Sequence, residues 1–479
     1  MAESNSITSG FAWSAFETYS TQGIMFLVSI VMARLLSPSD YGLIGMITVF
    51  LCIADTLIDA GFTKALIRKK HCNKQDYATV FYFNVAISCF LFGLLYISSP
   101  LIADFYKEPL LENISCMMGL TFVISSLGAV SNTILVRQLM FKKKALITFG
   151  CSVVSGGVGM YFAYKGLGVY SLVFQAILSA VLRMIIIVIV VRWRPSIAFS
   201  VESFREMFGF GSKILVSNLI YTIYQNIYNI VIGKFFSPAS LGYFTRADGY
   251  SKLIPTNING VLMKAMLPYL AKIQDDDDKL VQLNLRLVQA TSFLIFPATM
   301  FLAGAATPII SIMISDKWLP SAPLLQILCL SVLFDHVSTI NWEFLLAKGR
   351  SDILLRQQWY TKGISLLMLV ISIFIGLKAV AIGKGLSSFI LVISSLVSLR
   401  KVLPISLKDV YISLYRMLYS ALILGIGVFI SFMFLDYSIF NVAIVFILTM
   451  GLYLLMARLL FPQTLSSLVC IIKKKNCKI

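Results

Sequence analysis

The sequence has little charge, few histidines and no paired cysteines. Charged residues make up 13% of its 479 positions, about half of the share usual in a soluble domain, whereas hydrophobic residues make up 58%. Such a chain has too little polar surface to cover a core in water. Its two histidines and eight scattered cysteines form no C-x-x-C pair or other common zinc or redox motif. We therefore expect no metal or cofactor, and we expect the cysteines to be packing residues.

Three longer features are also missing. The first ten residues, MAESNSITSG, lack the basic start, short apolar core and cleavage site of a signal peptide, so we expect the first apolar segment to be retained. No G-x-x-x-x-G-K-[ST] loop occurs, which excludes ATP hydrolysis by that route. The longest expected outer loop, residues 99–111, holds no nucleophile–base pair. A membrane polymerase or ligase is therefore disfavoured, and we expect a protein that is not an enzyme.

Long apolar runs, by contrast, recur from end to end. Each is long enough to cross the bilayer as a helix, which takes about 20 residues. The sequence thus predicts an all-α integral membrane protein with about 14 transmembrane helices. Their expected limits are 11–33, 41–63, 79–99, 112–136, 145–164, 167–191, 212–235, 245–271, 287–313, 321–346, 358–377, 379–399, 411–435 and 438–460.

The basic residues indicate how these helices are oriented. With both termini in the cytoplasm, the inner segments hold about four times as many Lys and Arg residues as the outer ones, as the positive-inside rule requires. This distribution explains the net charge of +18 without a nucleic-acid partner. The acidic run DDDDK at 275–279 falls in an inner loop, where we expect it to be solvated.

One short turn occurs twice. LLSPSDYG at 35–42 is matched by FFSPASLG at 235–242, each after the first helix of a six-helix block. Because six is even, both blocks enter the membrane in the same direction, which predicts two parallel lobes at 1–200 and 201–405. Residues 406–479 would add two helices and a basic cytoplasmic tail. In each turn we expect the proline to fix φ and the glycine to adopt a positive φ.

The sequences of several segments resemble those of a known family. ARLLSPSDYGLIGMITVF, LIDAGFTKALIRKK, RWRPSIAFS and FFSPASLGYFTRA are similar to the Wzx-like polysaccharide transporters, which share a superfamily with the MATE exporters and the lipid II flippases. The resemblance implies two six-helix lobes around a central cavity. It also implies a flippase that moves an undecaprenyl-pyrophosphate-linked oligosaccharide across the bacterial cytoplasmic (inner) membrane. Membrane lipids and other polysaccharide assembly proteins would be its partners.

A flippase for such a lipid must shield an anionic head from hydrocarbon, so intramembrane cations are candidate ligands. Arg246, Lys252 and Lys264 share one unusually polar predicted helix, and Arg183 and Lys384 are further cations within spans. Polar side chains at helical spacing on the first helices of the two lobes are the other candidates, and these include Gln22, Asn226 and Asn229. The alternative roles are interhelical hydrogen bonding for the polar groups, and snorkelling or pairing with Asp248 for the cations.

Transport also needs an energy source, for which an ion gradient of H⁺ or Na⁺ is the default. The candidate coupling residues are the intramembrane acids Glu17, Asp55 and Asp59, while Asp335, His336 and Glu343 form a second group. The main alternative function is a MATE-like exporter of drugs or small metabolites. Cationic drugs favour acidic cavities, whereas the cations here are at least as numerous as the acids, which favours the anionic lipid.

Overall fold

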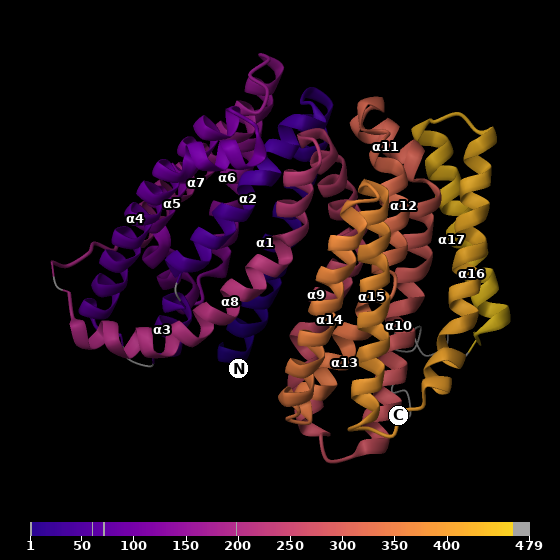
Figure 1. Ribbon diagram of the computed structural model, residues 1–479. Coiled ribbons are helices and arrows are strands. Elements are labelled where there is room, and N and C mark those ends of the chain that lie inside the picture. Colours follow the sequence, from indigo (N-terminus) through magenta and orange to yellow (C-terminus); the bar gives the residue numbers. More distant parts are fainter. Residues whose placement is uncertain (1, 60, 70–71, 198, 463–479) are drawn as a thin grey trace. The chain divides into compact units, whose positions relative to one another are not determined.

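The computed structural model of the protein describes residues 2–59, 61–69, 72–197 and 199–462, and these ranges contain helices and no strand (Figure 1). The helices are α1 (Ala2–Leu35), α2 (Pro38–Asp59), α3 (Phe62–Arg68), α4 (Lys74–Tyr106), α5 (Leu110–Arg137), α6 (Phe141–Tyr164), α7 (Tyr170–Val191), α8 (Val201–Phe235), α9 (Pro238–Lys272), α10 (Asp277–Gly304), α11 (Ala306–Ile314), η1 (Asp316–Trp318), α12 (Ser321–Val332), α13 (Asp335–Ala347), α14 (Ser351–Ile373), α15 (Leu377–Arg400), α16 (Leu407–Phe434) and α17 (Ile439–Leu460).

Every predicted span falls on helix, which confirms the all-α membrane fold. Within the described residues, 10 helical segments are long and apolar enough to cross a membrane, counting α12 and α13 as one. Helices α1, α8, α9 and α14 coincide with predicted spans but do not belong to this set. Three of them, α1, α8 and α9, carry all the predicted substrate-binding residues. The described part of α1, Tyr19–Leu35, is an apolar helix that is shorter than a full span.

The structure differs from the predicted spans in four places. The single span expected at 287–313 is divided into α10 and α11, and that at 321–346 into α12 and α13. The short helix α3 was not predicted. The outer loop expected at 99–111 is mostly helix, because α4 continues to Tyr106 and α5 begins at Leu110. The hydrophobic runs did not predict this extension, because residues near the end of a membrane helix need not be apolar.

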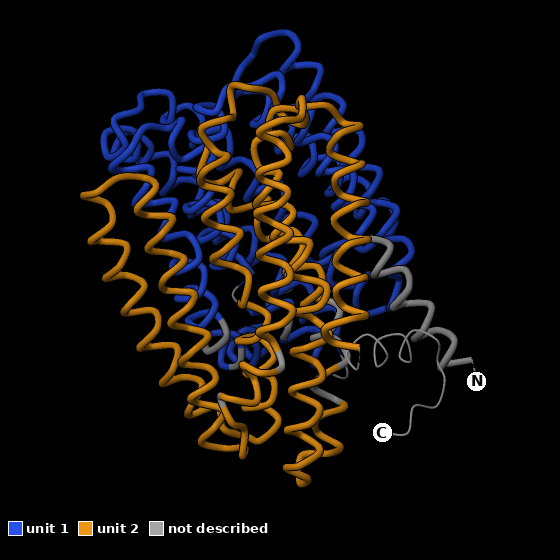
Figure 2. The backbone as a smooth tube through the Cα atoms, turned by 90° about the vertical axis from the view of Figure 1, so that its right-hand side faces the viewer, with its two compact units in different colours: residues 1–242 blue, residues 243–479 orange. Residues whose placement is uncertain are grey.

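The chain forms two compact units, residues 1–242 and 243–479 (Figure 2). In unit 1, α4 packs on α5, α1 on α6, and α2 on α8. In unit 2, α10 packs on α16, α14 on α15, and α15 on both α12 and α13. The boundary between the units falls inside α9. The predicted lobes, 1–200 and 201–405, follow the sequence repeat instead, and that division remains a prediction.

The two repeated turns both build a helix N-terminus. Before α2, the Ser37 hydroxyl accepts a hydrogen bond from the Asp40 backbone amide (3.2 Å), and the Asp40 carboxylate accepts one from the Ser37 amide (2.8 Å). Before α9, the Ser237 hydroxyl accepts from the Ser240 amide in the same way (3.3 Å). Each proline then occupies the first position of its helix, where its missing N–H group costs nothing.

The glycines of the repeat do not have the predicted positive φ. Gly42 and Gly242 lie within α2 and α9, and neither is among the positive-φ residues of the described chain. Their role is close approach: a Cβ on Gly42 would lie 1.8 Å from the Pro238 carbonyl oxygen, and one on Gly242 would lie 2.0 Å from that of Pro38. The repeated motif therefore occurs twice because its two copies pack reciprocally, backbone against backbone.

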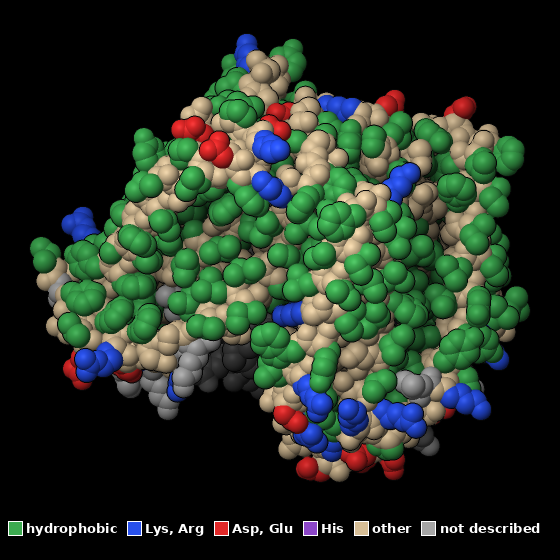
Figure 3. Space-filling model, in the orientation of Figure 1, with side chains coloured by type: hydrophobic (Ala, Val, Ile, Leu, Met, Phe, Trp, Pro, Cys, Tyr) green, Lys and Arg blue, Asp and Glu red, His purple; other side chains and the backbone are tan. Residues whose placement is uncertain are grey.

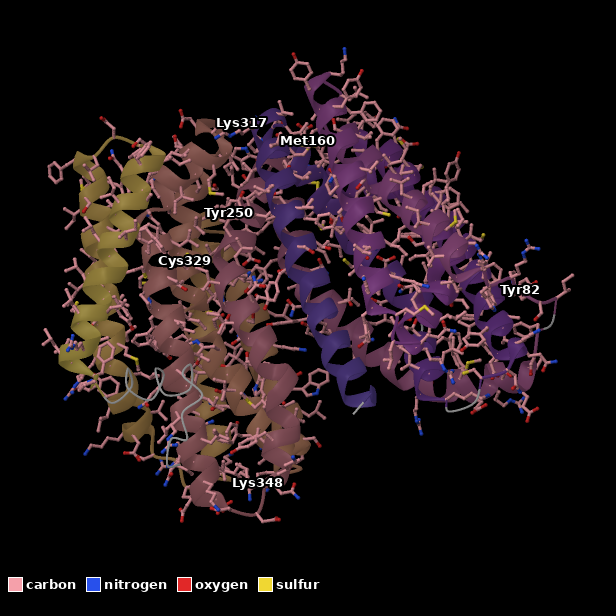
Figure 4. The ribbon with its side chains drawn as sticks, turned by 180° about the vertical axis from the view of Figure 1, so that it is seen from behind. Tyr82, Met160, Tyr250, Lys317, Cys329 and Lys348 are labelled. Atoms are coloured by element: carbon pink, nitrogen blue, oxygen red, sulfur yellow. The ribbon has the colours of Figure 1, made fainter. Side chains whose placement is uncertain are left out.

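Charged and hydrophobic side chains occupy different parts of the surface of unit 2. Figure 4 places Lys317 and Lys348 at opposite ends of this unit, with Tyr250 of α9 between them. Lys348 belongs to a predicted inner segment and Lys317 to a predicted outer one. In Figure 3, Lys and Arg side chains gather together with Asp and Glu side chains at the end of unit 2 formed by the lower ends of α13, α14 and α15, while hydrophobic side chains cover its side. This arrangement is the one expected for a bundle that crosses a bilayer.

Candidate functional site

A cluster of charges joins α9 to α15 within unit 2. Asp248 of α9 accepts a hydrogen bond from Lys252, one turn further along the same helix, with 2.8 Å between Nζ and Oδ2. Its other oxygen, Oδ1, forms an ion pair with Lys384 of α15. The side chain of Lys384 is 15% exposed and that of Lys252 is 42% exposed. A single carboxylate thus holds two ammonium groups of different accessibility.

Aromatic rings flank these cations. The Nζ of Lys384 lies 5.2 Å from the ring centroid of Phe244, and the Arg246 guanidinium carbon lies 5.8 Å from the ring centroid of Trp318. Trp318 is fully buried, and the hydroxyl of Tyr243 donates to the Lys317 carbonyl next to it (3.3 Å). Cation–π contacts of this kind favour a cation at a site with little water. Arg246 and Lys384 are therefore held by the protein itself.

Asp335 and His336 begin α13 next to this cluster. The Oδ1 atom of Asp335 is buried and has no hydrogen-bond partner among the described residues. His336 is fully buried, and its Nε2 atom lies 2.7 Å from the Ser292 hydroxyl of α10. His336 thus serves as an interhelical contact inside unit 2. The predicted group of Asp335, His336 and Glu343 is spread along α13 and does not converge on one point.

A second polar chain crosses the core of unit 2 and involves no charge. Asn284 of α10 donates to Asn341 of α13 (3.2 Å), and Asn341 donates to Ser395 of α15 (3.0 Å). All three side chains are fully buried. Because polar groups buried in a membrane protein need partners from neighbouring helices, this chain fixes the packing of three helices. It is a structural feature that sequence reasoning did not identify.

In unit 1, a polar residue of α8 contacts α2. The hydroxyls of Thr222 on α8 and Thr56 on α2 lie 3.1 Å apart. Asn226 donates to the Thr222 carbonyl of its own helix (2.9 Å). On α2, Asp55 is exposed and Asp59 is half-buried. The Thr56–Thr222 contact is an interhelical hydrogen bond, the alternative role given above for the polar groups of this helix.

The remaining predicted residues are spread over three helices. Gln22 is an exposed residue of α1, and Asn229 is a half-buried residue of α8. The side chains of Glu17 and Lys264 lie outside the described residues. Among the predicted substrate ligands, Arg246 and Lys252 both lie on α9, and Asp248 joins Lys252 to Lys384 of α15. Among the described residues, no group of three His, Cys, Asp or Glu side chains could hold a metal ion.

A second charge network lies at the start of α8 in unit 1. Lys69 forms ion pairs with Glu206 of α8 (2.9 Å) and with Asp76 of α4 (3.0 Å). The hydrogen bond to Glu206, together with that to Asp76, raises the pKa of Lys69 above its usual value. Asp76 is almost fully buried and also caps α4 through the Asn73 amide (2.9 Å). This network connects α8 to the α3–α4 corner and is fully accounted for by that structural role.

Comparison with known proteins identifies the family of the chain. A family described as "Polysaccharide biosynthesis protein" matches residues 31–323. The chain is 25% identical over 357 residues to the teichuronic acid biosynthesis protein TuaB of Bacillus subtilis, which covers 72% of each chain. It is 26% identical over 354 residues to the lipopolysaccharide biosynthesis protein WzxC of Escherichia coli, covering 72% of this chain and 70% of that protein.

Solved structures agree on the fold. The lipid II flippase MurJ in an inward closed conformation superposes with a TM-score of 0.75 at 15% identity, covering 94% of this chain and 99% of MurJ. An inward-facing multidrug resistance MATE transporter of the MOP superfamily superposes with a TM-score of 0.55 at 14% identity, covering 81% and 97%. The chain therefore belongs to the polysaccharide biosynthesis protein family, and it has the fold of the MOP-superfamily flippases and exporters.

Proposed function

We propose that the protein is a flippase that moves an undecaprenyl-pyrophosphate-linked oligosaccharide from the inner to the outer leaflet of a bacterial cytoplasmic membrane. The observation that carries this proposal is the family match over residues 31–323. The two relatives described above are named for the biosynthesis of teichuronic acid and of lipopolysaccharide. Both names point to cell-surface polysaccharides, whose repeat units must cross the membrane.

The charges of unit 2 support an anionic substrate. Arg246, Lys252 and Lys384 lie on helices that the sequence places in the membrane, where charged side chains are rare because inserting one costs on the order of 2.5–3.5 kcal/mol. A transporter keeps such groups where they serve its substrate. Lys and Arg are the natural donors to pyrophosphate oxygens. We propose alternating access coupled to an H⁺ or Na⁺ gradient as the mechanism of movement.

The test is deletion of the gene in its own host, followed by leaflet-resolved analysis of lipid-linked sugars. We expect the lipid-linked repeat unit to accumulate on the cytoplasmic face, and a plasmid copy of the gene to reverse this accumulation. Undisturbed glycan export together with altered drug tolerance would instead identify the protein as an exporter of the MATE type.

A further inference from the structure

The acid at the centre of the unit 2 cluster makes more contacts than a simple ion pair. Asp248 uses each of its carboxylate oxygens for a different ammonium group, Oδ2 for Lys252 and Oδ1 for Lys384. A phosphate oxygen would accept the same charge-assisted hydrogen bonds from the same two donors. The carboxylate oxygens of Asp248 therefore accept the same two hydrogen bonds that the phosphate oxygens of an anionic headgroup would accept from Lys252 and Lys384.

The two lysines are not equivalent. Lys384 is 15% exposed, comes from another helix, and packs over the Phe244 ring. Lys252 is 42% exposed and bonds Asp248 from one turn away on the same helix. Its flexible four-carbon stem can turn the ammonium group outward without any movement of the backbone. Lys252 is thus the cation that can change partner, whereas Lys384 stays with Asp248.

The charges of the cluster are nearly balanced. Two ammonium groups face Asp248, and Asp335 supplies a second carboxyl nearby whose Oδ1 atom has no hydrogen-bond partner among the described residues. If Lys252 left Asp248, the pair of Asp248 and Lys384 would remain neutral. The departure of Lys252 therefore leaves neither Asp248 nor Lys384 without a partner of opposite charge.

From these contacts we infer that Asp248 is an internal competitor of the substrate. It holds Lys252 when no anionic headgroup is present and yields it to a phosphate oxygen when one arrives. Recapture of Lys252 by Asp248 then helps to release the headgroup, because the emptied cation regains a partner at once. This inference rests on the proposed function for the nature of the headgroup. It assigns to Asp248 a positioning role and to Lys252 the direct contact.

The experiment uses the purified full chain in detergent, with inorganic pyrophosphate as the probe. An amine-reactive reagent modifies exposed lysines, and mass spectrometry measures the modification of Lys252 at increasing pyrophosphate concentrations. In the Asp248→Asn variant, we expect Lys252 to react faster, and we expect pyrophosphate to protect it at a concentration at least about fivefold lower, the lower end of usual coupling between sites. Asp352→Asn, which removes an acid paired with Arg350 outside the cluster, is the matched control and should change neither quantity.

A second variant guards against misfolding. Asp248→Asn combined with Lys384→Met removes one charge of each sign and leaves Lys252 without its competitor, so it should also bind pyrophosphate more tightly than the wild type. Equal protection of Lys252 in the wild type and in both variants would overturn the inference, as would tighter binding in the control.

The inference and the proposed function can fail separately. Suppose that pyrophosphate protects Lys252 in the expected pattern, but deletion of the gene leaves lipid-linked sugars undisturbed. This result would support the exchange at Asp248 and contradict the proposal that the protein is a flippase. Lipid-linked sugars that accumulate on deletion, in a protein whose Lys252 is never protected, would support the flippase and overturn the exchange.

Discussion

At the scale of single residues, the two glycines of the repeated turn show how little space separates α2 from the start of α9. The nearest atoms to a Cβ on either glycine belong to backbone, which cannot rotate away as a side chain can. We expect Gly42→Ala to destabilise the protein by about 3 kcal/mol or more, because the helices must separate to admit one methyl group. The apparent melting temperature in detergent measures this loss.

Gly249 of α9 is the matched control for that substitution. It lies two turns after Gly242 on the same helix, and a Cβ there would meet no atom within 4 Å. Gly249→Ala should therefore leave the melting temperature unchanged or raise it, because alanine is favoured over glycine in a helix by up to about 1 kcal/mol. If the Gly42→Ala and Gly249→Ala variants had the same melting temperature, the reciprocal contact would not contribute to stability.

At the scale of helices, the buried polar chain from Asn284 through Asn341 to Ser395 ties α10, α13 and α15 together. Replacing Asn341 with Leu keeps the volume but leaves the amide of Asn284 without its acceptor. We expect a loss of about 1–3 kcal/mol, the cost of an unsatisfied buried polar group. Thermal unfolding in detergent again gives the measurement.

Ser338 provides the comparison on the same helix. It is as buried as Asn341 and lies one turn earlier, but its hydroxyl has no hydrogen-bond partner among the described residues. Ser338→Ala should therefore be neutral or slightly stabilising. A destabilisation as large as that of Asn341→Leu would mean that α13 tolerates no substitution on this face, and that the polar chain has no special role.

The same scale shows what the sequence could and could not predict. Hydrophobic runs located the 10 segments of the described chain that are long and apolar enough to cross a membrane, because length and apolarity are local properties. The i, i+4 spacing of Asp248 and Lys252 also indicates their ion pair. The third member, Lys384, follows 136 positions after Asp248, and no local pattern connects the two. Gly42 was recognised as important for the wrong reason, since a close approach to residue 238 is invisible in either turn alone.

At the scale of the whole molecule, the flippase proposal gives Lys252 a direct role in transport. We expect Lys252→Met to lower the rate at which a plasmid copy restores glycan export to the deletion strain by about tenfold or more, equivalent to one charge-assisted hydrogen bond of roughly 1.5–3 kcal/mol. Quantitative immunoblotting of the membrane fraction normalises the rate to the amount of protein.

Lys279→Met is the control for the loss of a lysine from a helical ion pair. Lys279 pairs with Asp276 at the start of α10 (2.7 Å), with a side chain that is 66% exposed, so its removal should cost little. Export that fell equally in both variants would point to a general effect of lost positive charge, and it would remove Lys252 as a specific ligand.

Coupling to an ion gradient makes a different demand on the chain, namely an acid that gains and loses an ion during the cycle. Glu17 of α1 lies in the polar series of that helix, which makes it a candidate. Glu17→Gln keeps the shape of the side chain and removes its charge, so we expect transport to become independent of the gradient and to fall to background, with normal amounts of protein. The exposed Glu112 of α5 is the control, and Glu112→Gln should transport as the wild type does. Dissipating the membrane gradient in the control strain must then reproduce the Glu17→Gln phenotype; wild-type transport by Glu17→Gln would shift the coupling role to Asp55 or Asp59.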